Sequence, residues 1–316
     1  MTALKTFLLF ALLCGFILFG GFSNSIGSPA YSQLKLDANR ISWTHLTFEA
    51  KSFMADVTAQ LQLESMSADD VKAVLLKNKQ GDALPIPSTG AYKLISNTSM
   101  DIIGKSPVNM DNQVWFDPRD ATAFGRIRLR QGEDEQKKVY RFTKQGVFRH
   151  RKEPKDPQEA KQSPDKWTDE LDTFYAYDLP ELGCTNVSER LLLVYIASTA
   201  EELENDKPLS LCIFGKRQLF QVQLTSAGLE NVEVDYIEKK QQSEQRRKGK
   251  IKAHKIVLES RPLKSDLEKV ENFSFLGFQK NIAFFIDPKS NVPIQLSGEI
   301  PRAGNSTLKL QRVQLK

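Results

Sequence analysis

Histidine and cysteine are both scarce in this 316-residue chain, and their scarcity limits the chemistry that the chain can carry. It contains three residues of each type. His45, His150 and His254 stand in separate segments, without the close spacing that is typical of a metal site. We therefore expect structural or solvent-facing roles for the histidines, and we predict neither a metal nor a cofactor.

Motifs of catalysis and of nucleotide binding are also missing. The sequence has no nucleophile-elbow pattern and no glycine loop of the kind that cradles phosphates. It has no nucleic-acid-binding motif, and a net charge of +5 over this length gives no argument for nucleic acid as a partner. These absences favour a non-catalytic protein. A hydrolase whose site is assembled from distant residues is a remote alternative.

Long apolar runs are confined to the N-terminus. Lys5 is followed by a 17-residue apolar run from Thr6 to Phe22 and then by a small, polar segment from Ser23 to Ser32. This is the order of regions in a secretory signal, so we predict a signal peptide at residues 1–30 and a periplasmic location. The run is at the short end of what spans a bilayer. An uncleaved inner-membrane anchor facing the periplasm is therefore the alternative, and it would attach the chain to the membrane.

Two cysteines remain beyond this leader, because Cys14 lies inside it. Cys184 and Cys212 would be able to form a disulfide in an oxidising compartment. They would equally suit two small, buried apolar positions. A disulfide requires close Cα atoms, which the sequence does not specify, so both interpretations stay open.

Alternation of apolar and polar residues predicts the fold. It is clear at residues 57–64, 124–130 and 307–315, and it is typical of strands with one buried and one solvent-facing side. Phenylalanine is abundant, with 19 residues, which suits strands around a thick core. We predict a mainly β domain over residues 31–316, formed by a curved antiparallel sheet or half-barrel with one or two short helices.

The best helix candidate runs from Leu191 to Ala200. Asn186 or Ser188 would cap it, and Glu189 would lie in its first turn, where the helix dipole favours an acid. Residues 151–167 are charged and contain three prolines, which predicts a loop.

A second polar loop is expected at residues 241–250, at the tip of a hairpin. Its cations suggest contact with an anionic membrane surface or glycan, and they are Arg246, Arg247, Lys248 and Lys250. The simpler interpretation is a solvated hairpin tip whose long cations protect a sheet edge from aggregation.

A cluster of aromatic residues precedes the last strands. Phe273, Phe275 and Phe278 surround a Leu-Gly pair. They are candidates for the lining of an apolar ligand cavity, and ordinary core packing is the alternative.

From Asn112 onward, four features follow one another in an order that is also found in a known family. They are the strand and turn at 114–118 (VWFDP), the hairpin at 138–149, the strand-turn-strand segment at 211–220 and the closing strands at 282–310. This order resembles the exported bacterial proteins grouped as domain of unknown function 3108. The resemblance implies a secreted, curved antiparallel sheet that wraps a helix, and it implies neither an agreed activity nor catalytic residues.

These observations lead to one leading hypothesis and one rival. The first is a non-catalytic periplasmic protein that binds a hydrophobic or amphipathic envelope component, such as a lipid, in a groove of the sheet. The rival is a protein–protein interaction module that docks on another envelope protein through a sheet edge or the basic hairpin. A cavity favours the first hypothesis, and an exposed apolar patch or open edge favours the second.

Overall fold

Strands dominate the chain in the computed structural model, which describes residues 34–51, 55–77, 79–104, 106–132, 134–263, 271–301 and 304–316. The predicted signal segment, residues 1–30 with Cys14, lies outside these ranges. Over the described residues, no helix is long and apolar enough to cross a membrane.

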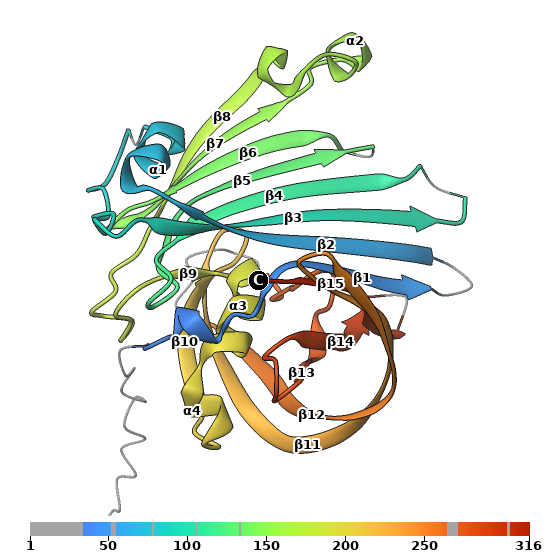
Figure 1. The fold of residues 1–316 in the computed structure, drawn as a ribbon. Helices are drawn as coiled ribbons and strands as arrows, with labels where there is room; N and C mark the ends of the chain where they lie inside the picture. The colour runs from blue at the N-terminus through green and yellow to red at the C-terminus, as the bar shows by residue number, and fades with distance from the viewer. Residues whose placement is uncertain are drawn as a thin grey trace, which may run out of the picture. The chain divides into compact units, whose positions relative to one another are not determined.

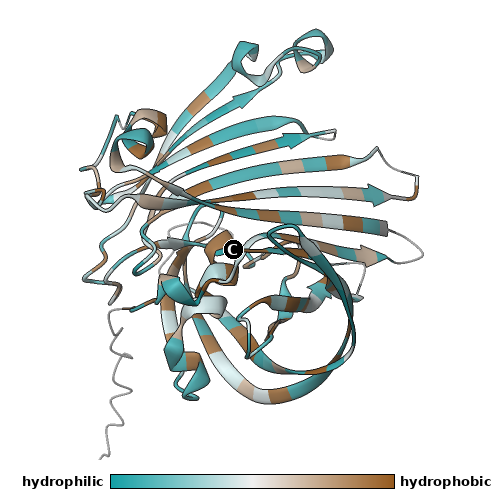
Figure 2. Cartoon of the chain, in the orientation of Figure 1, coloured by the Kyte–Doolittle hydropathy of each residue, from teal (hydrophilic) through white to brown (hydrophobic). Residues whose placement is uncertain are grey.

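The first half of the chain forms a curved array in which each strand pairs antiparallel with the next (Figure 1). Apolar and polar residues alternate along these strands, and Figure 2 shows the resulting bands. The predicted curved antiparallel sheet is confirmed, although the pattern did not reveal β3 or β8. The eight strands of the array are β1 (Trp43–Lys51), β2 (Ala55–Met66), β3 (Ala91–Ile102), β4 (Val108–Phe116), β5 (Ala123–Gln131), β6 (Gln136–Phe142), β7 (Gly146–Glu153) and β8 (Asp169–Ala176).

The second half closes on itself. The end of β11 pairs in parallel with the end of β15, from Ile237 opposite Arg312 to Lys240 opposite Leu315. Strands β11 to β15 therefore form a ring, and β15 also pairs with β1 of the array. The strands of this half are β9 (Ser188–Glu189), β10 (Leu209–Phe214), β11 (Leu219–Lys240), β12 (Ser243–Pro262), β13 (Lys280–Ile286), β14 (Pro293–Ile300) and β15 (Gly304–Leu315).

The hairpin of β11 and β12 is longer than the sequence predicted. Residues 241–250 are not a loop, because the two strands continue to a turn at Gln241 and are 22 and 20 residues long. Strand β11 is continuous apart from a bulge between Ser226 and Leu229. A bulge bends a strand strongly, and in Figure 1 this hairpin curves round β13 and β14.

The helices are few and short. Residues 151–167 were predicted as a loop, but the first three continue β7 and the rest include α2 and η2, with Trp167 buried at the end. Proline is compatible with both short helices because it occupies the first positions of each, where no backbone donor is needed. The α-helices are α1 (Ala68–Val74), α2 (Pro157–Ala160), α3 (Leu193–Thr199) and α4 (Glu201–Glu204), and the 3₁₀ turns are η1 (Ala38–Arg40), η2 (Pro164–Lys166) and η3 (Arg190–Leu192).

Helix α3 is buried along its whole length, as expected of a helix that is apolar on all sides. The helix predicted at 191–200 is confirmed as η3 followed by α3. The hydroxyls of Ser198 and Thr199 donate to the carbonyls one turn earlier, at 2.9 and 2.8 Å, so neither buried hydroxyl lacks a partner. The predicted caps were wrong, because Glu189 is the capping residue and its carboxylate accepts the Leu191 N–H at 2.6 Å.

The apolar part of the array packs against this helix. The Tyr195 ring contacts Phe116 edge-on with 4.9 Å between the ring centroids, and its hydroxyl donates to the carbonyl of Pro118 at 2.8 Å. The buried side chains of the array join the same core, and they include Leu94, Val114, Phe142 and Val147. One end of the concave face is therefore filled by α3.

Cys184 and Cys212 are joined by a disulfide in the structure, with their Cα atoms 6.0 Å apart. The bond links the segment that precedes β9 to strand β10. The disulfide therefore closes a loop of the chain that contains η3 and α3.

We expect the double variant Cys184→Ala/Cys212→Ala to be less stable than the wild type by about 3–4 kcal/mol, because a bond across 28 residues restricts the unfolded chain. Urea denaturation of both proteins, each with and without reductant, measures this. Reductant should lower the wild type to the level of the variant and leave the variant unchanged. A wild type that ignores reductant and whose two thiols can both be alkylated would contradict the expectation.

Candidate functional site

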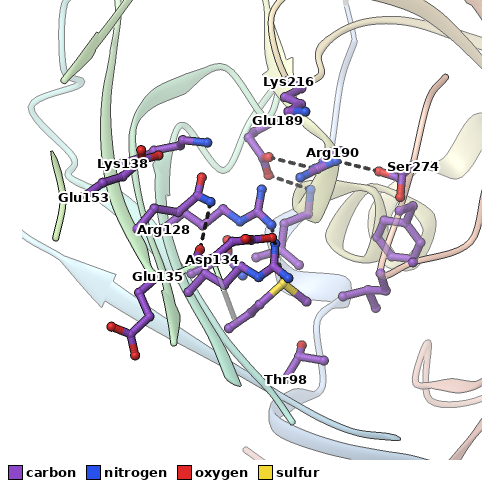
Figure 3. A pocket seen from close by; sticks show the side chains of 18 of the residues that line it. Thr98, Arg128, Asp134, Glu135, Lys138, Glu153, Glu189, Arg190, Lys216 and Ser274 are labelled. Atoms are coloured by element: carbon purple, nitrogen blue, oxygen red, sulfur yellow. Dashed lines mark hydrogen bonds and ion pairs between the residues drawn. The ribbon is translucent and has the colours of Figure 1, made fainter. Parts of the chain in front are cut away.

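A cavity of about 860 Å³ opens on the concave side of the array, beyond the part that α3 fills. One wall consists of strands β3 to β7. The other consists of β9 and η3, the turn between β10 and β11, and residues 274–277 (Figure 3). We call this space the central cavity. Its volume is within the range of small-molecule sites, which is about 300–1,000 Å³.

Strand register brings a group of cations to the concave face. Side chains two residues apart share a face of a strand, so Arg126, Arg128 and Arg130 of β5 point the same way. Arg128 lies opposite Lys138 of β6, which lies opposite Arg151 of β7. The cations on this face of the three strands are Arg126, Arg128, Arg130, Lys138, Arg149 and Arg151.

The cations that line the central cavity differ in their partners. Three lie near a carboxylate: Arg130 is 3.5 Å from Asp134, Arg190 is 3.7 Å from Glu189 and Lys216 is 3.8 Å from Glu271. The other two are Arg128 and Lys138. No carboxylate among the described residues lies within 4.0 Å of either one, and the nearest described partner of Arg128 is the weakly accepting sulfur of Met110, at 3.4 Å.

The charged forms of Arg128 and Lys138 are disfavoured in the folded protein. Lys138 is only 8% exposed, and burial is the main reason that its pKa falls to about 8, with Arg128, Arg149 and Lys216 lowering it further. Burial likewise lowers the pKa of Arg128 to about 10, helped by repulsion from Arg190 and Arg126. A buried charge without a partner of opposite sign opposes folding, so the positions of Arg128 and Lys138 reduce the stability of the fold.

The rest of the lining is mixed. Apolar atoms come from Met110, Pro154, Leu191, Phe275 and Leu276, and neutral hydrogen-bonding groups come from Thr98, Asn112, Gln136 and Ser274. Carboxylates come from Asp134, Glu135, Glu153 and Glu189. Figure 3 shows Lys138 and Arg128 on the strand side and Arg190 with Ser274 on the opposite side. The cavity therefore offers a cationic patch beside an apolar one, which suits an amphipathic molecule.

A buried ion pair fixes the two walls to each other. Arg126 and Glu189 form a hydrogen-bonded pair, and their side chains are each 2% exposed. The second carboxylate oxygen of Glu189 accepts the Leu191 N–H, and the Arg126 guanidinium lies 3.9 Å from the centre of the Tyr140 ring. Arg190 is held in turn by its donation to the carbonyl of Ser274 at 3.0 Å.

The aromatic candidates divide between core and cavity. All three are buried, and only Phe275 lines the central cavity. Phe273 packs edge-on against Phe220, with 5.4 Å between centroids, and Phe278 lies directly against the backbone position of Gly298. The cluster as a whole therefore does not form an apolar pocket.

The cations of the long hairpin are largely neutralised. Arg246 forms a bidentate ion pair with Asp235, with N–O distances of 2.6 and 2.8 Å, and Arg247 pairs with Glu238. Lys248 lies 3.6 Å from Asp235, and Lys250 lies opposite Glu233 on β11. This arrangement supports the solvated-hairpin interpretation more than contact with an anionic surface.

The histidines do not gather with other ligands, and the described residues contain no cluster of three metal-binding side chains. His254 is 2.7 Å from the Ser226 hydroxyl at the bulge of the long hairpin, and His150 is 2.7 Å from Asp172. Neither pair lines the central cavity.

The residues of the central cavity were not among the predicted site residues, Phe275 excepted. A signal was present, because the segment 124–130 (FGRIRLR) places three arginines on one face of a strand. A strand of a soluble protein normally alternates between an apolar buried face and a polar exposed one. The segment appeared to follow that rule, and nothing local shows that its arginine face is the inner one.

Comparisons with known proteins leave the family open. No family model matches the chain, and no curated protein matches it. Among solved structures, the chain is similar to a crystal structure from Brucella abortus, described as a beta-barrel-like protein of domain of unknown function DUF1849. The identity is 10% and the TM-score is 0.42, with 88% of this chain and 99% of that chain covered. Both are β-rich, and the likeness does not identify domain of unknown function 3108.

We expect Glu189→Gln to lower the free energy of unfolding by about 3 kcal/mol, because it leaves the buried Arg126 without a counter-charge while keeping an acceptor for Leu191. Glu244→Gln is the matched control, since Glu244 pairs with Arg312 at 2.7 Å with both side chains about half exposed. The control should cost less than about 1 kcal/mol. Equal losses in urea denaturation would contradict a special role for the buried pair.

We expect Lys138→Met to stabilise the protein at pH 7 by about 3 kcal/mol, the equivalent of a pKa lowered from 10.5 to about 8. Below pH 8 the lysine is charged in both states, so its penalty is full. Between about pH 8 and the ordinary lysine pKa of 10.5 the side chain is neutral only in the folded protein, so the wild type gains stability and the difference from the variant closes. Lys137→Met is the control, because Lys137 pairs with Asp165 at 2.5 Å on the opposite face of β6. A variant no more stable than wild type would refute the expectation.

Proposed function

We propose that this protein is a non-catalytic binding protein whose ligand is an anionic amphiphile. The acidic headgroup would lie against Arg128 and Lys138, and the apolar portion against Met110, Leu191 and Phe275. The observation that carries the proposal is the pair of cations that lines an open cavity with no carboxylate within 4.0 Å among the described residues.

Physical reasoning favours a ligand over a purely structural role. Some buried or clustered cations have acids beside them, as Arg126 has Glu189 and Arg246 has Asp235. Two others, Arg141 and Arg149, are buried with no carboxylate within 4.0 Å among the described residues, and neither lines the central cavity. Arg128 and Lys138 line an open cavity, where a bound anion would offset the cost of their burial. Sites of this kind, which weaken the fold in exchange for function, are typical of binding proteins.

The same features refine the leading hypothesis. A purely hydrophobic ligand would leave both cations buried beneath apolar atoms, at a cost of several kcal/mol. An amphipathic ligand meets both patches of the lining. The proposal therefore keeps the amphipathic alternative and sets the hydrophobic one aside.

Location and family are part of the proposal. The N-terminal pattern of residues 1–30 supports export to the periplasm, and a disulfide between Cys184 and Cys212 would persist there. An envelope lipid is then the natural source of an anionic amphiphile. The order of motifs after Asn112 supports membership of the domain of unknown function 3108 group.

Native mass spectrometry would test the binding proposal on the full exported chain, purified gently and then incubated with an envelope extract. We expect the wild type to carry added mass that matches an acidic lipid. The double variant Arg128→Gln/Lys138→Met should lose at least about tenfold in occupancy, since hydrogen bonds to charged groups contribute about 1.5–3 kcal/mol each.

The matched control is Lys137→Met/Lys152→Met, which removes two cations from the same part of the sheet. Lys137 lies opposite Lys152 on β6 and β7, and both pair with surface acids, Asp165 and Glu170. This control should bind as the wild type does. A protein that stays free of added mass in the extract would contradict the proposal and leave the rival, docking on another envelope protein, as the next candidate.

A further inference from the structure

The number and arrangement of charges in the central cavity say more about the headgroup. Arg126 and Arg190 both lie against the single carboxylate of Glu189, so this trio keeps one surplus positive charge. Arg128 and Lys138 each add one more. Three further carboxylates line the cavity. Asp134 lies 3.5 Å from Arg130, and Glu153, which also acts on Lys138, lies 3.1 Å from Arg151. Glu135 has no such cation among the described residues and offsets one of the three surplus charges, so the site has room for more than one negative charge.

The surplus is concentrated in a small volume. Arg128 and Lys138 lie directly opposite each other on neighbouring antiparallel strands, which sets their Cβ atoms about 4.5–5.5 Å apart. Arg190 faces them from η3, and it is the charge that most strongly opposes that of Arg128. Three cationic groups therefore line the cavity from two walls (Figure 3).

A flat, singly charged carboxylate or a singly charged sulfate would neutralise only part of this surplus. A phosphate monoester carries a charge of about −1.5 to −2 at neutral pH and presents three strong acceptor oxygens. Arginine suits such a group because its planar fork donates two parallel hydrogen bonds, and lysine adds a point charge.

We infer that the central cavity binds the phosphate monoester headgroup of an amphiphile, held by Arg128, Lys138 and Arg190. This inference rests on the proposed function, and it narrows the headgroup from any acid to a doubly charged phosphate.

The inference implies a characteristic dependence on pH. A phosphate monoester gains its second charge near pH 6, so its affinity should rise from pH 5 to pH 7. Lys138 faces Arg128 of β5, Arg149, Arg151 and Glu153 of β7 and Lys216 of the β10–β11 turn, and it loses its proton near pH 8. Affinity should therefore fall again above that pH, and an alkyl sulfate should show the fall without the earlier rise.

Isothermal titration of the full chain with three probes tests this: octyl phosphate, octyl sulfate and inorganic phosphate. At pH 7.5 we expect octyl phosphate to bind roughly tenfold tighter than octyl sulfate, since its extra charge strengthens the hydrogen bonds it accepts. At pH 5 the two should bind alike. Inorganic phosphate should bind more weakly than octyl phosphate, because it cannot use the apolar patch.

Two variants keep the result interpretable. Arg128→Gln/Lys138→Met should abolish the preference for phosphate. Lys138→Arg keeps its charge at every pH of the experiment, so it should retain the preference and lose the fall above pH 8.

The outcomes separate the two levels of the argument. Equal affinity for octyl phosphate and octyl sulfate at pH 7.5, with both lost in the double variant, would overturn the phosphate inference and leave the anionic-amphiphile proposal intact. If inorganic phosphate binds as tightly as octyl phosphate, the ligand does not need an apolar part, and this would contradict both the proposed function and the phosphate inference. Binding of neither octyl probe, or binding that the double variant does not change, would remove the proposed function and this inference together.

Discussion

The ion pair between Arg126 and Glu189 is the constraint on which the rest of the site depends. It joins the middle of β5 to the start of η3, two segments that are 63 residues apart. Glu189 also caps η3, so the position of the central helix and the position of the cavity wall are set by one side chain. Buried pairs add little net stability compared with apolar packing, yet losing one partner is severe. Such a pair specifies an arrangement more than it strengthens the fold.

That constraint explains why the cavity is cationic. Glu189 is committed to Arg126 and to the Leu191 N–H, so it has little left with which to balance the neighbouring Arg128. Lys138 is directly opposite Arg128, and it also has no carboxylate within 4.0 Å among the described residues, although Glu153 acts on it from farther away. A natural protein departs from the rule that buried charges are paired chiefly at functional sites. Arg141 and Arg149 are also buried without a carboxylate within 4.0 Å among the described residues, but Arg128 and Lys138 are the unpaired cations that line a cavity. Their access to that cavity is the reason for the proposed binding role.

The sequence predicted the kind of structure better than it predicted the site. Period-two alternation is a local property, so most strands of the array could be recognised, and the apolar run of α3 was equally clear. Strand β8 was missed because Asp169–Ala176 is mostly exposed and has little alternation. The cavity depends on which face of β5 is the inner one and on which strand lies beside it. Both are set by long-range pairing, and a single sequence does not reveal that pairing.

The two basic segments of the chain show why composition alone misleads. The long hairpin has the denser run of cations, Arg246 to Lys250, and it looked like the better anion-binding surface. Its partner strand supplies Asp235 and Glu238 at matching positions, so these charges are largely satisfied in water, where an ion pair contributes little. On β5 and β6, Arg128 and Lys138 lie opposite each other and not opposite acids, and both are at least partly buried in the wall of the central cavity. Affinity for an anion depends on charge that the protein leaves unbalanced, and the strand register places that charge at Arg128 and Lys138.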